Sequence, residues 1–185
     1  KQMEALGVKK SIIREIFEYA KARKAEIGEE NVFDYSIGNP SIPAPEIVSE
    51  TLIRLLTESD PTVLHGYTSA QGDAGVRAAI SDYIQKTYGA PADEKLIYLT
   101  AGAAAALTIS LNAILSDDTS EEVIVFAPFF PEYRVFTEKA GGRLVPVPCS
   151  EPDFQIDFDA FESAITEKTK AVIVNSPNNP TGVIL

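Results

Sequence analysis

The sequence predicts an α/β fold, a three-layer α/β/α sandwich in which helices cover both faces of a mostly parallel sheet. Two observations support this prediction. From residue 96 onward, short apolar runs alternate with segments of helical periodicity, a pattern typical of βαβ units. Two of these runs, residues 123–126 and 171–174, are continuously apolar, as expected of strands that are buried on both faces. An N-terminal helical segment precedes this region.

The N-terminal segment begins with a predicted helix over residues 11–27, where apolar side chains recur at helical spacing. Ser11 can cap this helix and Gly28 ends it. Residues 32–37 have the composition of a short strand. Residues 38–45 contain three prolines and a glycine, so we expect a loop there.

Two more helices are expected before the sheet region. Apolar residues at helical spacing predict a helix over residues 46–57 and another over 73–87, with Asp73 as the N-terminal cap of the second. The segment between them, residues 61–72, is expected to be a loop.

In the sheet region, from residue 96 onward, expected strands alternate with expected helices. Each expected strand is short and apolar, and each expected helix begins or ends at a glycine, a proline or a polar residue. The expected strands are residues 96–100, 123–126, 143–147 and 171–174, and the expected helices are residues 103–115, 131–140 and 158–166.

Composition excludes several classes of function. The chain has 185 residues, of which 45% are hydrophobic, enough for a domain with a real core. Its formal net charge of −11 gives no general attraction to nucleic acid or to an anionic membrane surface. No apolar stretch is long enough to span a bilayer, and the N-terminus does not resemble a signal peptide. We therefore expect no nucleic-acid partner and no membrane association.

The single cysteine and the single histidine limit the disulfides and metal sites that the chain can form. Cys149 cannot form an intramolecular disulfide, which fits a reducing cytoplasm, and it is expected to be an inert side chain. With His65 as the only histidine, a zinc site built from cysteine and histidine is not expected.

Three segments follow expected strands, where ligands collect in open α/β sheets. Residues 100–107, TAGAAAAL, place a glycine and small residues at the start of a helix, which suits a phosphate, although alanine is also simply the best helix former. Residues 127–133, APFFPEY, could stack on a flat ligand or could pack in the core. Residues 175–182, NSPNNPTG, contain more asparagine and proline than a simple turn needs.

The NSPNNPTG segment after a buried strand resembles the signature loop of the class I/II aminotransferases, which have fold type I and use pyridoxal 5'-phosphate. This family includes the aspartate and aromatic aminotransferases. Other segments resemble the family in order and approximate spacing, and together they span nearly the whole chain. They are IGNP at 37–40, HGYTSAQG at 65–72, VRAAI at 76–80, YG at 88–89, TAGAAAAL at 100–107 and PFFPEY at 128–133.

The resemblance implies roles for individual residues. Asn179 is expected to donate to the phenolic oxygen of the cofactor ring, and Phe130 to stack on that ring. The backbone N–H groups of Ala103 and Ala104, after Gly102, are expected to hold the phosphate. Many relatives have serine, threonine or glutamine there, whereas this chain has only alanine. The phosphate must therefore rely on these backbone groups and on residues elsewhere.

The remaining roles concern the substrate and a second subunit. Tyr67 is expected to reach the phosphate bound by a neighbouring subunit, which implies a homodimer. Gly38 is expected to lie at the substrate carboxylate, with Asn175 and Tyr133 as further substrate-site candidates. The substrates implied are an amino acid and a 2-oxo acid. Residues 1–40 would belong to a small domain and residues 41–185 to the first part of a large cofactor-binding domain.

The residues that perform transamination in this family follow the NPTG loop, and none of the ten lysines here lies in the matching motif. The resemblance therefore implies a fragment that lacks the catalytic lysine and is inactive alone. Two alternatives stay open from the sequence: a lyase of the same fold that uses the same cofactor, and a non-catalytic binding or dimerisation module.

Overall fold

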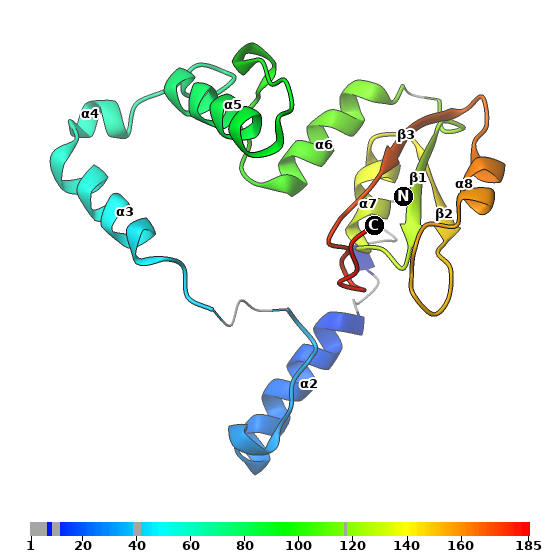
Figure 1. Cartoon of the computed structure of the whole chain (residues 1–185). Helices are drawn as coiled ribbons and strands as arrows, with labels where there is room; N and C mark the ends of the chain where they lie inside the picture. The colour runs from blue at the N-terminus through cyan, green and yellow to red at the C-terminus, as the bar shows by residue number, and fades with distance from the viewer. Residues whose placement is uncertain (1–6, 9–11, 39–41, 117) are drawn as a thin grey trace. The chain divides into compact units, whose positions relative to one another are not determined.

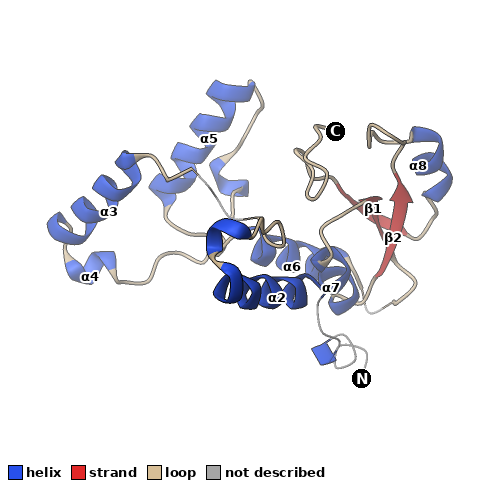
Figure 2. Cartoon of the chain, turned by 90° about the horizontal axis from the view of Figure 1, so that it is seen from below, coloured by secondary structure: helices blue, strands red, loops and turns tan. Residues whose placement is uncertain are grey.

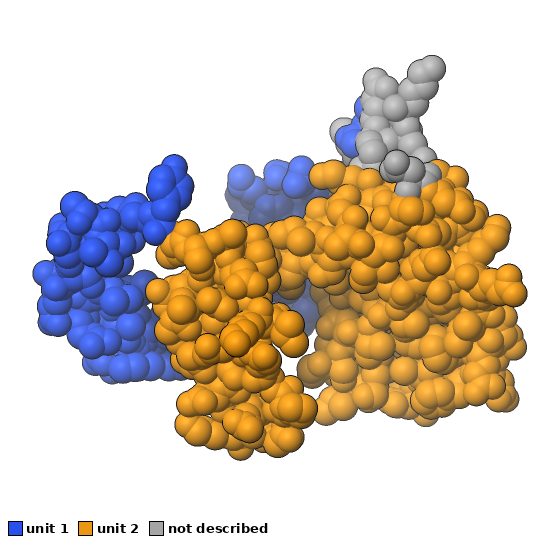
Figure 3. Space-filling view, turned by 90° about the horizontal axis from the view of Figure 1, so that it is seen from above, with its two compact units in different colours: residues 1–67 blue, residues 68–185 orange. Residues whose placement is uncertain are grey.

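The computed structural model describes residues 7–8, 12–38, 42–116 and 118–185. The chain divides into two compact units, residues 1–67 and residues 68–185, which Figure 3 colours separately. The predicted domain boundary between residues 40 and 41 falls outside the described residues and stays a prediction.

All regular secondary structure in the described part of unit 1 is helical. Its elements are α2 (Ile12–Ile27), the 3₁₀ helix η1 (Glu29–Asn31), α3 (Glu46–Glu58) and α4 (Pro61–Leu64). The predicted helices at 11–27 and 46–57 are confirmed to within a residue. The predicted cap Ser11 lies outside the described residues.

The predicted strand at residues 32–37 is wrong. Residues 32–35 have no regular structure and residues 36–37 form a bend. The Asp34 carboxylate accepts hydrogen bonds from the backbone N–H and the hydroxyl of Ser36, at 3.0 and 2.6 Å, and these local bonds favour a turn. No described segment of unit 1 is a strand that could pair with this one.

The expected loop at residues 61–72 contains a short helix that the sequence analysis did not predict. Asp60 caps α4, because its carboxylate accepts a hydrogen bond from the backbone N–H of Thr62 at 2.7 Å. Pro61 occupies the first helical position, where its missing N–H costs nothing. The sequence analysis assigned only a loop here, although Asp60 followed by Pro61 is typical of the start of a helix.

Unit 2 contains the sheet and the helices around it. The helical elements are α5 (Ala74–Tyr88), η2 (Glu94–Leu96), α6 (Ala103–Ile114), α7 (Glu132–Lys139) and α8 (Phe158–Ala164), and the strands are β1 (Glu122–Ala127), β2 (Arg143–Pro148) and β3 (Thr169–Ile173). The predicted cap of α5 is confirmed, because the Asp73 carboxylate accepts a hydrogen bond from the Val76 N–H at 2.9 Å.

The predicted strand at residues 96–100 is also wrong. Asp93 caps η2, which ends at Leu96, and residues 97–100 have no regular structure. The backbone N–H of Leu99 donates to the carbonyl of Gln71 at 3.0 Å rather than to a strand. An apolar run becomes a strand only when a partner strand satisfies its backbone groups, and the described residues provide none here.

The sheet is parallel, with strand order β2-β1-β3. The strands are drawn in red in Figure 2. Central strand β1 pairs with β2 along its whole length and with β3 from Glu122 to Val125. Residues 123–125 of β1 are at most 1% exposed, so the prediction of a strand that is buried on both faces is confirmed for β1. The same prediction for residues 171–174 is wrong, because β3 is an edge strand and Val172 and Val174 are 39% and 58% exposed.

Two separate hydrophobic clusters show that helices cover both faces of this sheet. On one face, Val123 and Val125 pack with Leu111 and Leu115 of the α6 region and with Tyr133 of α7. On the other face, a second cluster contains Ile124, Phe126 and Val147 and packs against Ala160 and Phe161 of α8. Figure 1 shows α7 and α8 beside the sheet. The predicted three-layer α/β/α arrangement is therefore confirmed.

Among the described residues, no helix combines the length and the apolar character that a membrane crossing needs.

Candidate functional site

The candidate site lies where β1 and β3 end. Both strands are parallel and adjacent, with Val125 opposite Ile173, so the segments that follow them leave the sheet at the same edge. These segments are residues 128–131, which lead into α7, and residues 174–185. The site prediction placed Phe130 on the first segment and Asn175 and Asn179 on the second, and the topology brings both segments to one edge.

A buried asparagine joins the two segments. The side-chain amide of Asn178 donates to the carbonyl oxygen of Pro128 at 3.1 Å and to the hydroxyl of Thr181 at 2.9 Å. The residue is only 8% exposed. Its backbone N–H donates to the Val183 carbonyl at 2.8 Å, and its carbonyl accepts from the Gly182 N–H at 2.7 Å. Asn178 therefore closes a turn in one segment while it binds the other.

Phe130 also contacts α7, the helix that follows its loop. Its ring packs edge-to-face against the ring of Tyr133, with 5.5 Å between the centroids and 77° between the planes. The backbone N–H of Tyr133 donates to the Phe130 carbonyl at 3.1 Å. Tyr133 is buried in the core cluster, and this burial raises the pKa of its hydroxyl. Phe130 itself is partly exposed, so one side of its ring can contact a ligand.

The three asparagines of the loop differ in burial. Asn175 is half-buried and, with Phe129, Tyr133 and Asn178, lines a cavity of about 10 Å³. This volume suits a single water molecule and excludes a cofactor ring. Asn179 is exposed. A ligand that contacts this edge must therefore lie on the outer side of the loop, where Asn179 and Phe130 are accessible.

The start of α6 leaves backbone donors free for an anion. Gly102 precedes the helix with a φ of 85°, and no side chain caps the helix there. Ala103 and Ala104 are exposed, and the first N–H groups of a helix have no partner within it. Leu107, one turn later, packs against the cluster that contains Tyr133 and Phe130, which ties α6 to the core beneath the site.

Two predicted site residues belong to unit 1. The side chain of Tyr67 is fully exposed. Gly38 is exposed and has open space around the position of a Cβ. The structure brings Phe130, Tyr133, Asn175 and Asn179 together within unit 2, and the roles predicted for Tyr67 and Gly38 stay predictions.

Sequence reasoning missed Asn178, the residue that organises the edge. The loop holds two other asparagines, Asn175 and Asn179, so the sequence did not distinguish Asn178 from a generic turn residue. The one usable signal was the spacing to Thr181, because an asparagine side chain often bonds a group two or three residues further along its own turn.

The family model for "Aminotransferase class I and II" matches residues 30–185, most of the chain. The chain belongs to this family. The resemblance inferred from the NSPNNPTG loop is therefore confirmed.

Individual aminotransferases agree with this assignment. The chain is 34% identical over 180 residues to an aromatic-amino-acid aminotransferase from Thermococcus litoralis, covering 96% of this chain and 43% of that protein. The crystal structure of an aminotransferase from Eubacterium rectale matches with a TM-score of 0.94 and 53% identity, covering 99% of this chain and 46% of that one. An aspartate aminotransferase from Thermotoga maritima matches with a TM-score of 0.83 and 33% identity, covering 97% and 46% of the two chains. The chain thus spans less than half the length of these relatives.

Proposed function

We propose that the complete protein is an aminotransferase that moves an amino group between an amino acid and a 2-oxo acid by means of pyridoxal 5'-phosphate. The observation that supports this best is the shared edge at the ends of β1 and β3. There, Asn178 binds the loop that carries Phe130 and closes the turn that presents Asn179. Family membership supplies the chemistry, since aminotransferases generally depend on this cofactor.

The residues at this edge suit a flat, phosphorylated ring. An exposed amide at Asn179 would donate to the ring's phenolic oxygen, and the Phe130 ring, braced by Tyr133, would pack on one ring face. The free N–H groups of Ala103 and Ala104 would hold the phosphate at the positive end of α6. When bound, the cofactor supplies an electron sink for chemistry at the substrate's α-carbon.

The remaining assignments are proposals from the family resemblance. Gly38, Asn175 and Tyr133 would face the substrate, and Tyr67 would reach the phosphate bound by a second subunit of a homodimer. Residues 1–40 would belong to a small domain and residues 41–185 to the large one. We propose a cytoplasmic location, consistent with the single cysteine.

The similarity to known aminotransferases does not identify which amino acid is the amino donor. Relatives of comparable identity are named for aromatic amino acids, aspartate and alanine. The substrate class is therefore proposed only as amino acids and 2-oxo acids.

The test uses the protein expressed from its complete reading frame. We expect it to bind pyridoxal 5'-phosphate with an absorbance band and to transfer an amino group to a 2-oxo acid. Asn179→Ala should weaken cofactor binding about tenfold, the cost of one hydrogen bond to a charged oxygen. As the matched control, Asn112→Ala removes an exposed amide that bonds only the Thr108 carbonyl of its own helix, and it should leave binding unchanged.

Two results would contradict the proposal. Release of pyruvate from cystathionine without amino transfer would indicate a lyase that uses the same cofactor. Absence of any absorbance band with added cofactor would indicate a protein without this chemistry.

A further inference from the structure

Of the three asparagines in the loop at residues 175–182, Asn178 is the buried one, and its side-chain amide donates hydrogen bonds within the protein. Asn175 is half-buried and Asn179 is exposed, whereas Asn178 is 8% exposed. Both hydrogens of its side-chain amide have acceptors, one on Pro128 and one on Thr181. Pro128 is 50 residues away in sequence, so this is a tertiary contact rather than a local turn bond.

The bond to Pro128 fixes the loop that carries Phe130. Pro128 lies two residues before Phe130, and the carbonyl of Phe130 in turn accepts the N–H of Tyr133. The segment is therefore held at its start by Asn178 and at its end by α7. The hydrogen bond from Asn178 to Pro128 is partly buried, so the loss of its donor should cost stability.

The same residue fixes the turn that presents Asn179. The backbone of Asn178 bonds both Val183 and Gly182, and its amide bonds the Thr181 hydroxyl. Gly182 has a φ of 74°, a conformation that glycine adopts without strain and that lets the chain turn back to form these bonds. Asn179 lies inside this closed turn, directly after the residue that closes it.

We propose that Asn178 is a positioning residue for the cofactor, one that holds Phe130 and Asn179 in a fixed spatial relation. The inference rests on the proposed function for its ligand but on the hydrogen bonds above for its mechanism. The buried side-chain amide of Asn178 then sets the distance between Phe130, which would contact the face of the cofactor ring, and Asn179, which would bond the phenolic oxygen of that ring. Phe130 and Asn179 could each contact the cofactor ring without Asn178, but their fixed separation depends on Asn178.

The test compares three variants of the complete protein: Asn178→Ala, Thr181→Val and the control Asn112→Ala. Without cofactor, hydrogen exchange at the backbone N–H of Tyr133 reports the order of the Phe130 loop. We expect exchange there to become about tenfold faster in Asn178→Ala, while amides in the middle of α6 keep their protection. Thr181→Val removes the acceptor within the turn but keeps the bond to Pro128, so exchange at Tyr133 should change little.

The second readout is the bound cofactor itself. Asn178→Ala should weaken binding of pyridoxal 5'-phosphate about tenfold. It should also raise the pH midpoint of the cofactor's absorbance change, because a ring oxygen with a misplaced donor holds its proton more tightly. A purely structural role would lower the thermal midpoint without moving this pH midpoint. Thr181→Val should show a smaller shift in the same direction, and Asn112→Ala none.

The outcomes separate the two proposals. If the wild-type protein binds no cofactor but exchange at Tyr133 rises in Asn178→Ala, the proposed function fails and the coupling of the loops stands. If the wild-type protein binds cofactor and Asn178→Ala leaves exchange, affinity and pH midpoint unchanged, the positioning role is wrong. If Asn178→Ala does not fold, Thr181→Val decides: an unchanged pH midpoint overturns the proposal.

Discussion

Phe130 illustrates how a single side chain acquires its role from its surroundings. The sequence analysis considered both core packing and ligand stacking for the FF pair, and the structure shows the core packing while the stacking on a ligand stays a proposal. Phe130 packs at the margin of the core cluster and is braced edge-to-face by Tyr133, yet it stays partly exposed. A ring fixed on one side and open on the other suits a flat ligand.

Replacing Phe130 by leucine in the complete protein should preserve the packing against the core cluster. It should remove the aromatic ring face that would contact the cofactor. We expect cofactor binding to weaken about fivefold, since an aromatic contact of this kind contributes about 1 kcal/mol beyond the area that it buries. A titration of cofactor absorbance measures this. Phe158→Leu, at an exposed phenylalanine that begins α8, is the control and should bind normally. Equal affinities for the Phe130 variant and the wild type would remove Phe130 from the site.

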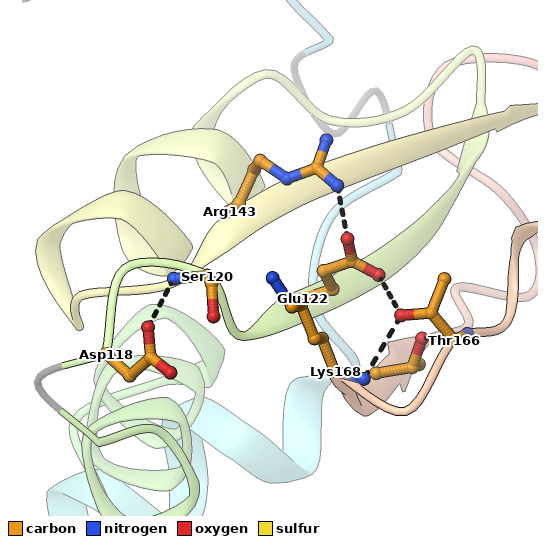
Figure 4. A network of polar contacts seen from close by, with 7 residues as sticks. Asp118, Ser120, Glu122, Arg143, Thr166 and Lys168 are labelled. Atoms are coloured by element: carbon orange, nitrogen blue, oxygen red, sulfur yellow. Dashed lines mark hydrogen bonds and ion pairs between the residues drawn. The ribbon is translucent and has the colours of Figure 1, made fainter.

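At the scale of elements, the opposite edge of the sheet is held by a network of polar contacts (Figure 4). Glu122 begins β1 and is buried. Its carboxylate forms an ion pair with Arg143 of β2 and accepts the hydroxyl of Thr166, at 2.8 Å, from the loop before β3. The backbone N–H of Lys168 donates to that hydroxyl at 3.1 Å. One carboxylate therefore joins all three strands at their amino ends.

This network predicts a pH dependence of stability. The hydrogen bond from Thr166, and then the bond and charge of Arg143, lower the pKa of Glu122 although its burial opposes them. A group with a lowered folded-state pKa stabilises the fold fully above its ordinary pKa, and this contribution disappears as the pH falls through the lowered value. Stability should thus decline on the acidic side of the ordinary glutamate pKa of about 4.3.

Glu122→Gln should lower the free energy of unfolding at neutral pH by about 1–2 kcal/mol, the range for a hydrogen bond that involves a charge. The difference from wild type should shrink as the pH falls below about 4, because the wild-type carboxyl group then also becomes neutral. Urea unfolding at a series of pH values measures both effects. Glu162→Gln, at an exposed position on α8, should show neither. A difference that stays constant with pH would mean that the charge of Glu122 has no part in the effect.

At the scale of the whole molecule, three of the lysines that the structure describes are held in ion pairs. Lys170, the second residue of β3, pairs with Glu121 at 3.5 Å, at the amino edge of the sheet, whereas Phe130 and Asn179 lie at its carboxyl edge. Lys24 and Lys86 pair with carboxylates of their own helices or nearby turns.

The 185-residue polypeptide by itself, mixed with pyridoxal 5'-phosphate and then borohydride, should therefore show no stoichiometric modification of one defined lysine. Mass spectrometry of the digested product measures this, with the urea-unfolded polypeptide as the control for random reaction at surface amines. A single fully modified lysine in the folded sample, absent from the unfolded one, would overturn this expectation.

Much of the fold was predictable because it depends on local patterns. Helical periodicity placed α2, α3, α5 and α6, and continuous apolar runs placed β1 and β3. The composition predicted burial on both faces correctly for β1 but not for β3, an edge strand in which Val172 is 39% exposed. The errors at residues 32–37 and 96–100 share one cause. Both are short segments with a strand-like composition whose strand formation depends on a distant partner, and a linear pattern carries no information about a partner.

The sequence by itself determined the family, the three-layer class and the residue types at the strand ends, because periodicity and the NSPNNPTG motif are written in consecutive residues. Only the tertiary structure decided which asparagine of that motif is buried. Asn175, Asn178 and Asn179 are chemically identical in the sequence. Asn178 differs because parallel pairing of β1 and β3 brings the Pro128 carbonyl within hydrogen-bonding distance of its amide, a contact between residues far apart in the chain.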